Sequence, residues 1–262
     1  MVLLITGIAN GIGKEVAEIF IKQGHKVYGI DIQKSTNRKI ISYQGDITQE
    51  KQLLMIKEQI KKDNIRLDAI LNFAGIHRMG SLIEENYENI RRLLEINLLG
   101  TILVNKIFYD LLDEKGRIVI TTSEVANLDP MPFNGIYHIS KTALDCYSQS
   151  LRQELNLKNQ KVITIRPGAV QTSLCDGSLI ETTKLCQETK LYQEESKHFL
   201  HLIQKFMGKP MSPSLLAKKI YKISLKKYPK YIYNIHHNMG LVLLNILPKR
   251  CQCAIIKFLL KR

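Results

Sequence analysis

Residues 6–13 read TGIANGIG and stand between a short apolar run, residues 2–5, and a stretch of helical period that continues to Gln23. Three glycines within seven residues permit a tight turn and let a ligand approach the backbone N–H groups at the start of a helix. A strand, a glycine turn and a helix in this order are typical of a dinucleotide-binding βαβ unit, although the spacing differs from the usual G-x-G-x-x-G pattern. A plain strand-to-helix turn is the alternative interpretation.

Short β-rich runs continue to alternate with longer helical stretches up to about residue 170. This pattern predicts an α/β fold, with a Rossmann-type doubly wound parallel sheet of about seven strands flanked by helices on both faces. The expected strands lie near residues 2–6, 26–31, 40–45, 68–73, 116–122, 161–166 and 231–235. The expected helices lie near residues 11–24, 48–62, 81–112, 135–157 and 212–227.

We expect one domain over residues 1–262 that carries two additions to the sheet core. Residues 172–212 mix polar, charged and apolar residues without a clear strand, and are interpreted as a substrate lid. Residues 236–262 are interpreted as a basic, amphipathic, helical C-terminal extension. Between the two, Ser212 and Pro213 are a typical N-cap and first helical residue.

The net charge of +14 arises in residues 196–262 alone, which hold fourteen Lys and Arg and no Asp or Glu, while the remaining 24 basic residues balance 24 acidic ones. Such a segment can face anionic lipid, an anionic substrate or nucleic acid, or remain a solvated surface. We expect peripheral contact with anionic membranes, and the alternative is that the extension packs as a dimer or lid surface. No nucleic-acid partner is expected, because no aromatic platform or recognition helix is present.

The five cysteines include no C-x-x-C pair, and their odd number argues against a fully paired disulfide framework. No second Cys or His pair stands at zinc-site spacing from Cys251 and Cys253, so no metal site is expected. The apolar start is too short for a signal peptide, and no apolar run approaches the roughly twenty residues that a bilayer requires. These features predict a cytoplasmic protein, with membrane attachment only at its periphery.

Asp31 closes the second expected strand, eighteen residues after the last glycine of the turn. An acidic side chain at this place accepts hydrogen bonds from the ribose hydroxyls of an adenosine. A carboxylate also repels the extra phosphate of NADP, and the neighbours Asn10 and Ile32 supply no cation, so NAD is the predicted cofactor. Lys34 and Arg38 follow closely and keep NADP as the less favoured alternative.

Two further strand ends carry candidate cofactor contacts. Asp46 follows the third expected strand and either contacts an adenine amino group or caps the next helix, for which Thr48 is equally suitable. The fourth expected strand leads into Asn72-Phe-Ala-Gly75, where small residues let the backbone lie close to a cofactor.

Tyr137 and Lys141 stand four residues apart, so a helix presents both on one face. A pair of this kind is expected about once by chance in such a chain, but this one opens the helix after the fifth strand, where α/β sheets bind ligands. A nearby ammonium and an oxidised nicotinamide favour phenolate, so we expect Lys141 to lower the pKa of Tyr137 towards the range that acid–base catalysis needs. Ser123, at the end of that strand, is placed to donate a hydrogen bond to a substrate oxygen.

Taken in order, these motifs resemble those of the short-chain dehydrogenase/reductase family, over about residues 1–175. The matching motifs are Thr6-Gly-x-x-x-Gly-x-Gly13, Asn72-x-Ala-Gly75, Asn97, Ser123, Tyr137-x-x-x-Lys141 and Pro167-Gly-x-x-x-Thr172. The resemblance implies Tyr137 as acid/base, Lys141 as a ligand of the nicotinamide ribose and Ser123 as orienter of the substrate. It also implies that Asn97 holds a water in a proton relay, and that Asp46 and Thr172 touch the adenine and nicotinamide ends.

The expected catalytic residues are therefore Asn97, Ser123, Tyr137 and Lys141. The expected cofactor contacts are Thr6, Gly7, Asn10, Gly11, Ile12, Gly13, Asp31, Ile32, Asp46, Ile47, Asn72, Ala74, Gly75, Tyr137, Lys141, Pro167, Gly168, Val170 and Thr172. One departure from the family pattern is Phe73, where a second asparagine is usual, and we expect it to repack the strand end.

The resemblance implies an NAD-dependent alcohol dehydrogenase or ketone reductase, and the lid and apolar C-terminus favour a steroid, retinoid or lipid-like substrate. The alternatives are a noncatalytic NAD-binding regulator and a basic nucleic-acid-binding protein. The family commonly forms homodimers or homotetramers through the helices near 81–112 and 135–157, so a homo-oligomer is implied as well. Two neighbours of the site are interpreted separately, His138 as a helix-surface or interface residue and Glu124 as a weak candidate for substrate contact.

Overall fold

The structure is a computed structural model that describes residues 1–206 and 209–261, and the side chains of all of these except 173–177 and 206. The side chain of Cys175, residues 207–208 of the predicted lid and residue 262 of the predicted extension therefore lie outside its description. The thiols of Cys146, Cys186, Cys251 and Cys253 are free. Among the described residues, no helix combines the length and the hydrophobicity needed to cross a bilayer.

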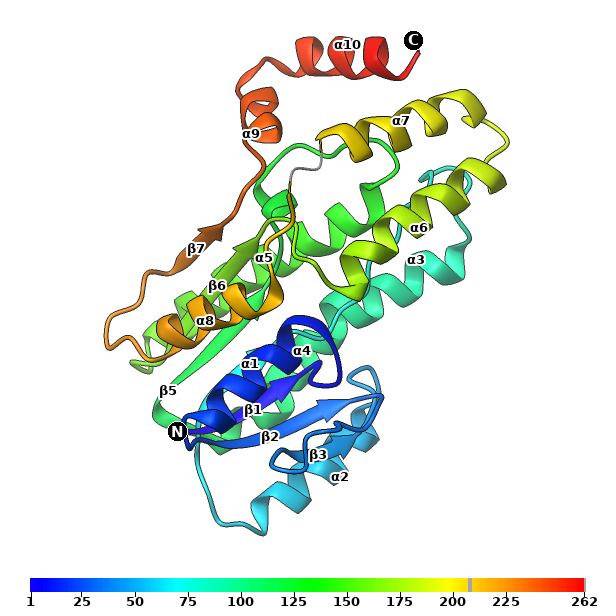
Figure 1. Cartoon of the computed structure of the whole chain (residues 1–262). Helices are drawn as coiled ribbons and strands as arrows, with labels where there is room; N and C mark the ends of the chain where they lie inside the picture. The colour runs from blue at the N-terminus through cyan, green and yellow to red at the C-terminus, as the bar shows by residue number, and fades with distance from the viewer. Residues whose placement is uncertain (207–208, 262) are drawn as a thin grey trace.

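Seven parallel strands form one sheet, in the order β3-β2-β1-β4-β5-β6-β7 (Figure 1). They are β1 (Val2–Thr6), β2 (Lys26–Asp31), β3 (Ile41–Gln44), β4 (Leu67–Asn72), β5 (Leu112–Thr121), β6 (Lys161–Pro167) and β7 (Ile232–Ile235). The doubly wound sheet expected from the sequence is thus confirmed. Its order reverses between β1 and β4, and open α/β sheets bind ligands at this switch point, beyond the carboxyl ends of the strands.

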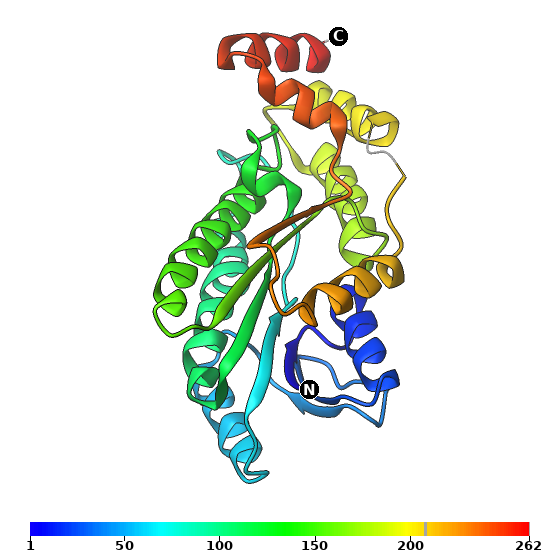
Figure 2. The same ribbon diagram turned by 90° about the vertical axis from the view of Figure 1, so that its left-hand side faces the viewer.

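Helices cover both faces of the sheet, which Figure 2 shows edge-on. They are α1 (Gly11–Lys22), α2 (Glu50–Lys61), α3 (Tyr87–Leu94), α4 (Thr101–Phe108), α5 (Gly135–Asn156), α6 (Ser173–Glu188), α7 (Gln193–Phe206), α8 (Pro213–Ser224), α9 (Met239–Ile246) and α10 (Lys249–Leu260). Successive side chains of a strand point to opposite faces, so Leu3 and Ile5 pack under α1 and α8 while Leu4 packs under α2 and α4. Each of these is fully buried and contributes about 1.5–3 kcal/mol through burial.

The prediction of a single helix over residues 81–112 is wrong. α3 and α4 are separated by a π-helical turn, Glu95–Gly100, and a short 3-10 turn follows α4. The chain then enters β5 at Leu112, four residues earlier than expected. A π turn changes the direction of the side chains within an otherwise helical stretch and often occurs at functional sites. Here it carries Asn97, which is completely buried.

The segment predicted to be a lid contains α6 and α7, and the C-terminal extension contains α9 and α10, so the extension is helical as expected. A separate apolar cluster joins these parts: Phe199 of α7 and Leu260 of α10 pack with Met79 and Phe133 from two loops. All four helices lie at the end of the molecule opposite α2 and β3 (Figure 1). The N-cap predicted at Ser212 is confirmed. Its hydroxyl accepts a hydrogen bond from the backbone N–H of Leu215, in the first turn of α8, at 3.3 Å.

Candidate active site

The glycine turn between β1 and α1 leaves room for a phosphate group at the start of the helix. Gly7 and Gly11 have φ angles of +74° and +60°, which L side chains rarely adopt. A Cβ atom on Gly13 would lie 2.2 Å from the carbonyl oxygen of Gly7, so the tight turn requires glycine there. Asn10 holds the N-cap position but makes no side-chain capping bond. The N–H groups of the first turn therefore remain uncapped, and this geometry fits the pyrophosphate of a dinucleotide.

Asp31, at the end of β2, lies directly beside the glycine turn. One of its carboxylate oxygens accepts the N–H of Ala9 and the other accepts the N–H of Gln33, both at 3.0 Å. Asn10 then donates to the Gln33 side chain at 3.2 Å. A carboxylate has about four acceptor positions, so Asp31 can brace the turn and still accept hydrogen bonds from ribose hydroxyls. Ile32 next to it is 61% exposed.

Asp46 forms a local turn with Thr48 and does not cap α2, so the alternative of Asp46 as a helix cap is wrong. Its Oδ1 accepts hydrogen bonds from the N–H and the hydroxyl of Thr48, at 2.9 and 2.8 Å. α2 begins after Gln49, which makes no side-chain cap, so the alternative of Thr48 as a helix cap is wrong. Ile47 is buried in the core under α2, and Ile12 packs against the core under α1. The side chain of Ile47 is therefore used for packing.

The end of β4 is fixed against β1 by one hydroxyl. Thr6 accepts hydrogen bonds from the N–H groups of Phe73 and Ala74, at 3.2 and 3.3 Å. Asn72 lies inside the sheet, where its amide donates to the side chain of Asn105 at 2.9 Å and to a backbone carbonyl of β5. The Phe73 side chain packs against the core under α1, and the end of β4 stays paired with β1 through Asn72 and Thr6.

Asn97 joins the loop after β4 to α5. Its Oδ1 accepts the N–H of Ile76 at 2.8 Å, and its amide donates to the Ile76 carbonyl at 2.9 Å and to the Ser140 hydroxyl at 3.1 Å. A Cβ atom on Gly75 would lie 3.1 Å from this Oδ1 and 3.5 Å from Nζ of Lys141. The structure thus brings Asn97, Gly75 and Lys141 together. The second lone pair of Oδ1 can accept a hydrogen bond from a relay water.

Tyr137 and Lys141 lie on the first turns of α5, each about 7% exposed, with Nζ 5.7 Å from the centre of the phenol ring. The pKa of Tyr137 is raised to about 12, mainly by burial and also by the nearby Glu124 carboxylate, although a hydrogen bond with Ser123 acts in the opposite direction. Burial also lowers the pKa of Lys141 to about 8.

The lowering of the Tyr137 pKa expected from Lys141 together with oxidised nicotinamide stays a prediction, and in the protein alone burial sets the opposite direction. The cost of removing a phenolate from water outweighs the favourable interactions around it. At neutral pH the phenol is protonated, and this is the form that donates a proton to a carbonyl oxygen.

The segment after β5 carries Ser123 and covers the start of α5. The Ser123 hydroxyl accepts the N–H of Val125 at 3.4 Å. Glu124 is 8% exposed and accepts the N–H of Asn238 at 2.6 Å, so its carboxylate binds the start of the C-terminal extension. His138, expected at the helix surface or at an interface, is instead buried within the chain, and the 3-10 turn after β5 packs against α5.

His77 is a neighbour of Tyr137 that the sequence analysis missed. Their ring centres are 4.4 Å apart and the rings are inclined by 61°. Burial lowers the pKa of His77 to about 4, although the nearby Asn134 side chain favours the protonated ring. Nδ1 of His77 and Oδ1 of Asn134 do not reach hydrogen-bond geometry with any described residue. The neutral imidazole of His77 thus packs against the Tyr137 phenol. In the sequence, only the position of His77 two residues after Gly75 points to this role.

The end of β6 closes the site from the other side. A Cβ atom on Gly168 would lie 1.9 Å from the carbonyl oxygen of His236, so glycine is required for β7 to approach. Val170 is buried and forms an isolated bridge with the chain before α8. The Thr172 methyl lies 3.5 Å from the position of a Cβ on Gly11. Thr172, which is predicted to touch the nicotinamide end, therefore lies next to the glycine turn.

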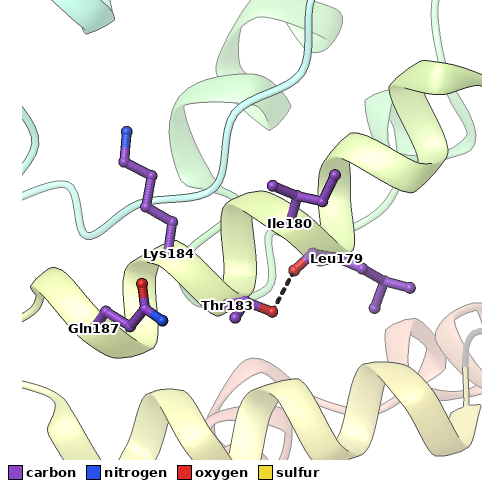
Figure 3. Close-up of a pocket in the computed structure, with 5 residues that line it drawn as sticks. All are labelled: Leu179, Ile180, Thr183, Lys184 and Gln187. Atoms are coloured by element: carbon purple, nitrogen blue, oxygen red, sulfur yellow. Dashed lines mark hydrogen bonds between the residues drawn. The ribbon is translucent and has the colours of Figure 1, made fainter.

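Two hollows lie on the predicted lid. One, of about 320 Å³, is lined by residues of α6 only, which Figure 3 shows: Leu179, Ile180, Thr183, Lys184 and Gln187. The other, of about 80 Å³, lies between α6 and the loop after β4, where Arg78 binds Glu85 at 2.7 Å and Glu181 at 3.3 Å. Neither is lined by Tyr137 or Ser123, so the converging side chains, and not these hollows, locate the reaction site.

The fold and the site together define an oxidoreductase with a nicotinamide cofactor. A family model described as short chain dehydrogenase matches residues 1–179. The chain therefore belongs to the short-chain dehydrogenase family.

Two curated relatives are similar to this chain. A 3-ketodihydrosphingosine reductase of Bacteroides thetaiotaomicron is 28% identical over 232 residues, which cover 88% of this chain and 86% of the relative. An NADPH-dependent 1-acyldihydroxyacetone phosphate reductase of Schizosaccharomyces pombe is 32% identical over 180 residues, or 66% of this chain and 60% of the relative.

Solved structures share the fold. A short chain dehydrogenase family protein from Francisella tularensis superposes with a TM-score of 0.74 at 25% identity, covering 89% of this chain and 96% of that one. ElxO with bound NADP superposes with a TM-score of 0.69 at 26% identity, covering 89% and 96%.

Proposed function

We propose that the chain is an NAD(H)-dependent reductase that converts a keto group of an apolar, lipid-like substrate into a hydroxyl group. The observation that carries this proposal is the buried Tyr137, with Lys141 and Ser123 beside it at the carboxyl end of the sheet. The relatives described above are named as reductases, which supports this direction of the reaction.

The residues divide the reaction between them. When bound, reduced nicotinamide supplies the hydride that adds to the carbonyl carbon. Tyr137 donates the phenolic proton to the carbonyl oxygen, so that hydride and proton together convert C=O into CH–OH. Ser123 donates a hydrogen bond to the same oxygen and stabilises its developing charge. The ammonium of Lys141 stabilises the phenolate that remains, which regains its proton through the water expected at Asn97.

NAD is the proposed cofactor because of Asp31. Its carboxylate lies beside the glycine turn, where the extra phosphate of NADP would approach it, and the neighbours Asn10 and Ile32 carry no positive charge to offset the repulsion. One relative is named as NADPH-dependent and ElxO binds NADP. The proposal therefore gives this chain a different cofactor from these two proteins, and Asp31 is its basis.

The apolar surroundings of the site support a lipid-like substrate. Met79 and Phe133 come from the loops that lead to His77 and Tyr137, and they pack with Phe199 and Leu185 of the predicted lid. The compounds in the relatives' names, 3-ketodihydrosphingosine and 1-acyldihydroxyacetone phosphate, are keto compounds, and the second carries an acyl group. We extend this class of substrate to the present chain.

The proposal is tested by following nicotinamide absorbance with the purified full chain. Long-chain keto lipids and a steroid ketone should each cause oxidation of NADH, with kcat/KM at least about tenfold above that of a short water-soluble ketone, since each buried methylene adds roughly 0.8 kcal/mol. NADH binding without turnover on any ketone would instead favour the noncatalytic regulator.

A further inference from the structure

α9 presents an apolar face that the rest of the described chain does not cover. Its sequence, MGLVLLNI, is almost wholly apolar, yet none of its residues is buried. Met239, Leu243 and Ile246 are 65%, 61% and 74% exposed, and spacings of four and three residues place them on one face. A concentration of large apolar side chains at a surface is typical of a binding site.

α10 continues this surface. Ile256 and Leu260 face inward and pack on α7. Ile255 and Leu259 lie four residues apart on another face and are 37% and 41% exposed. α10 therefore has two apolar faces. Packing against α7 explains the face of Ile256 and Leu260, but not the exposed face of Ile255 and Leu259.

Basic side chains lie on the side of α10 away from Ile255 and Leu259, and Phe258, which is 53% exposed, lies between the two groups. Arg250, Lys257 and Lys261 are seven and four residues apart, so they share a third face of the helix. All three are exposed and form no ion pair with any residue that the structure describes. Lys249 pairs with Asp129 of the segment after β5. Residues 236–262 contain no Asp or Glu, so the positive charge of the extension is not neutralised from within.

The exposed apolar side chains and the cations of α9 and α10 together indicate which partner would bind this surface. Apolar side chains and cations on the same helices fit the boundary of an anionic bilayer, where the apolar groups enter the acyl region and the cations approach the lipid phosphates. A second copy of the chain fits less well, because a two-fold interface would bring the same basic residues of both copies together.

The surface is attached to the catalytic region. Asn238 caps α9 through hydrogen bonds from two N–H groups of its first turn, and its own N–H donates to Glu124, the residue after Ser123, at 2.6 Å. Asn245 of α9 accepts the N–H of Asp129 at 2.6 Å. α9 and α10 also lie at the same end as α6 and α7 in both views (Figures 1 and 2). A membrane bound to α9 and α10 would therefore lie at the same end of the molecule as α6 and α7 of the predicted lid.

We propose that the open faces of α9 and α10 form a docking surface for an anionic membrane. Its apolar part is Leu243, Ile246, Ile255 and Leu259, and its basic part is Arg250, Lys257 and Lys261. The docking surface brings the lid to the place where lipid-like molecules partition. The inference goes beyond the proposed reaction and does not depend on it.

The test is flotation of the full chain with vesicles of phosphatidylcholine, with and without phosphatidylglycerol, at low and high salt. Wild type should float with the anionic vesicles at low salt and lose most of this binding at high salt. The triple variant R250E/K257E/K261E should bind at least about tenfold more weakly, because each cation near an anionic surface contributes roughly a fivefold gain. L243E/I246E should also lose binding.

Matched variants separate docking from general effects. K218E/K219E/K222E on α8 makes the same change of charge, and L54E/M55E on α2 places the same carboxylates on exposed apolar positions. Both should float like wild type, and all variants should keep the wild-type Tm and NADH affinity. Absence of flotation at low salt would overturn the proposal, as would equal binding by R250E/K257E/K261E. Conversion of a dimer into monomers by L243E/I246E, without vesicle binding, would assign the surface to a second copy instead.

Discussion

At the scale of single residues, the negative charge of Asp31 is the feature that distinguishes the two nicotinamide cofactors. Asp31→Asn keeps an oxygen that accepts the N–H of Ala9 but removes the charge. We expect the ratio of kcat/KM for NADPH to that for NADH to rise at least about tenfold, which corresponds to about 1.4 kcal/mol. Initial rates with both cofactors measure this ratio. An unchanged ratio in Asp31→Asn and in Asp31→Ala would show that the ribose is recognised elsewhere.

His77 makes the fold sensitive to acid. Its pKa in the folded chain is about 4, below the ordinary value of 6.5, so between these values the unfolded chain binds the additional proton. Stability is therefore lost as the pH falls from about 6.5 to about 4, by up to about 3 kcal/mol. His77→Phe keeps an aromatic ring against Tyr137 and should reduce this loss.

Denaturant unfolding at neutral pH and near pH 4.5 measures the effect, with His201→Phe on an exposed position of α7 as the control. If His77→Phe lost as much free energy of unfolding as wild type over this interval, the acid sensitivity would come from other groups.

At the scale of elements, the pairing of β6 with β7 depends on one glycine. Gly168→Ala would place a methyl group 1.9 Å from the carbonyl oxygen of His236, so backbone must move. We expect a loss of about 1–3 kcal/mol of stability, with reduced protection of the β7 amides in hydrogen exchange. Gly240→Ala, where the nearest atom is a side-chain oxygen at 3.2 Å, should cost much less. Equal Tm values for the two variants would contradict the close approach.

The alternation of short β-rich runs with longer helical stretches predicted all seven strands, because central strands such as β1 and β4 are nearly continuous buried apolar runs. The helix near 81–112 could not be predicted correctly, since a π turn keeps the composition of a helix while adding a residue to one turn. Helix propensity and the spacing of apolar residues in the sequence do not reveal this extra residue. Asn97 was nevertheless identified, because the order of family motifs does not require the local geometry to be known.

The same contrast holds for the site. Tyr137, Lys141 and Ser123 stand at strand and helix ends, which the sequence locates. His77 and the bond between Glu124 and Asn238 are visible only in three dimensions, because their partners are distant along the chain or carry no motif. The direction of the pKa shift of Tyr137 also required the structure, since burial decides it.

At the scale of the whole molecule, two ends have different properties. The glycine turn and Asp31 lie at the switch point of the sheet, and α6 begins directly after Thr172, which lies beside that turn. α7, α9 and α10 lie farther towards the end of the molecule away from α2 and β3 (Figure 1). The proposed reaction thus takes place at the end of the sheet near Tyr137, whereas the proposed membrane contact uses α9 and α10.

The central claim is that Tyr137 donates the proton during hydride transfer. Tyr137→Phe removes one hydroxyl and keeps the ring that packs against His77. Steady-state rates with a keto lipid that is turned over by wild type, together with NADH binding by fluorescence, test the claim directly. We predict that kcat falls by about 10²–10⁴-fold while the Kd for NADH changes by less than about threefold. A variant that reduces the ketone at the wild-type rate would contradict the account.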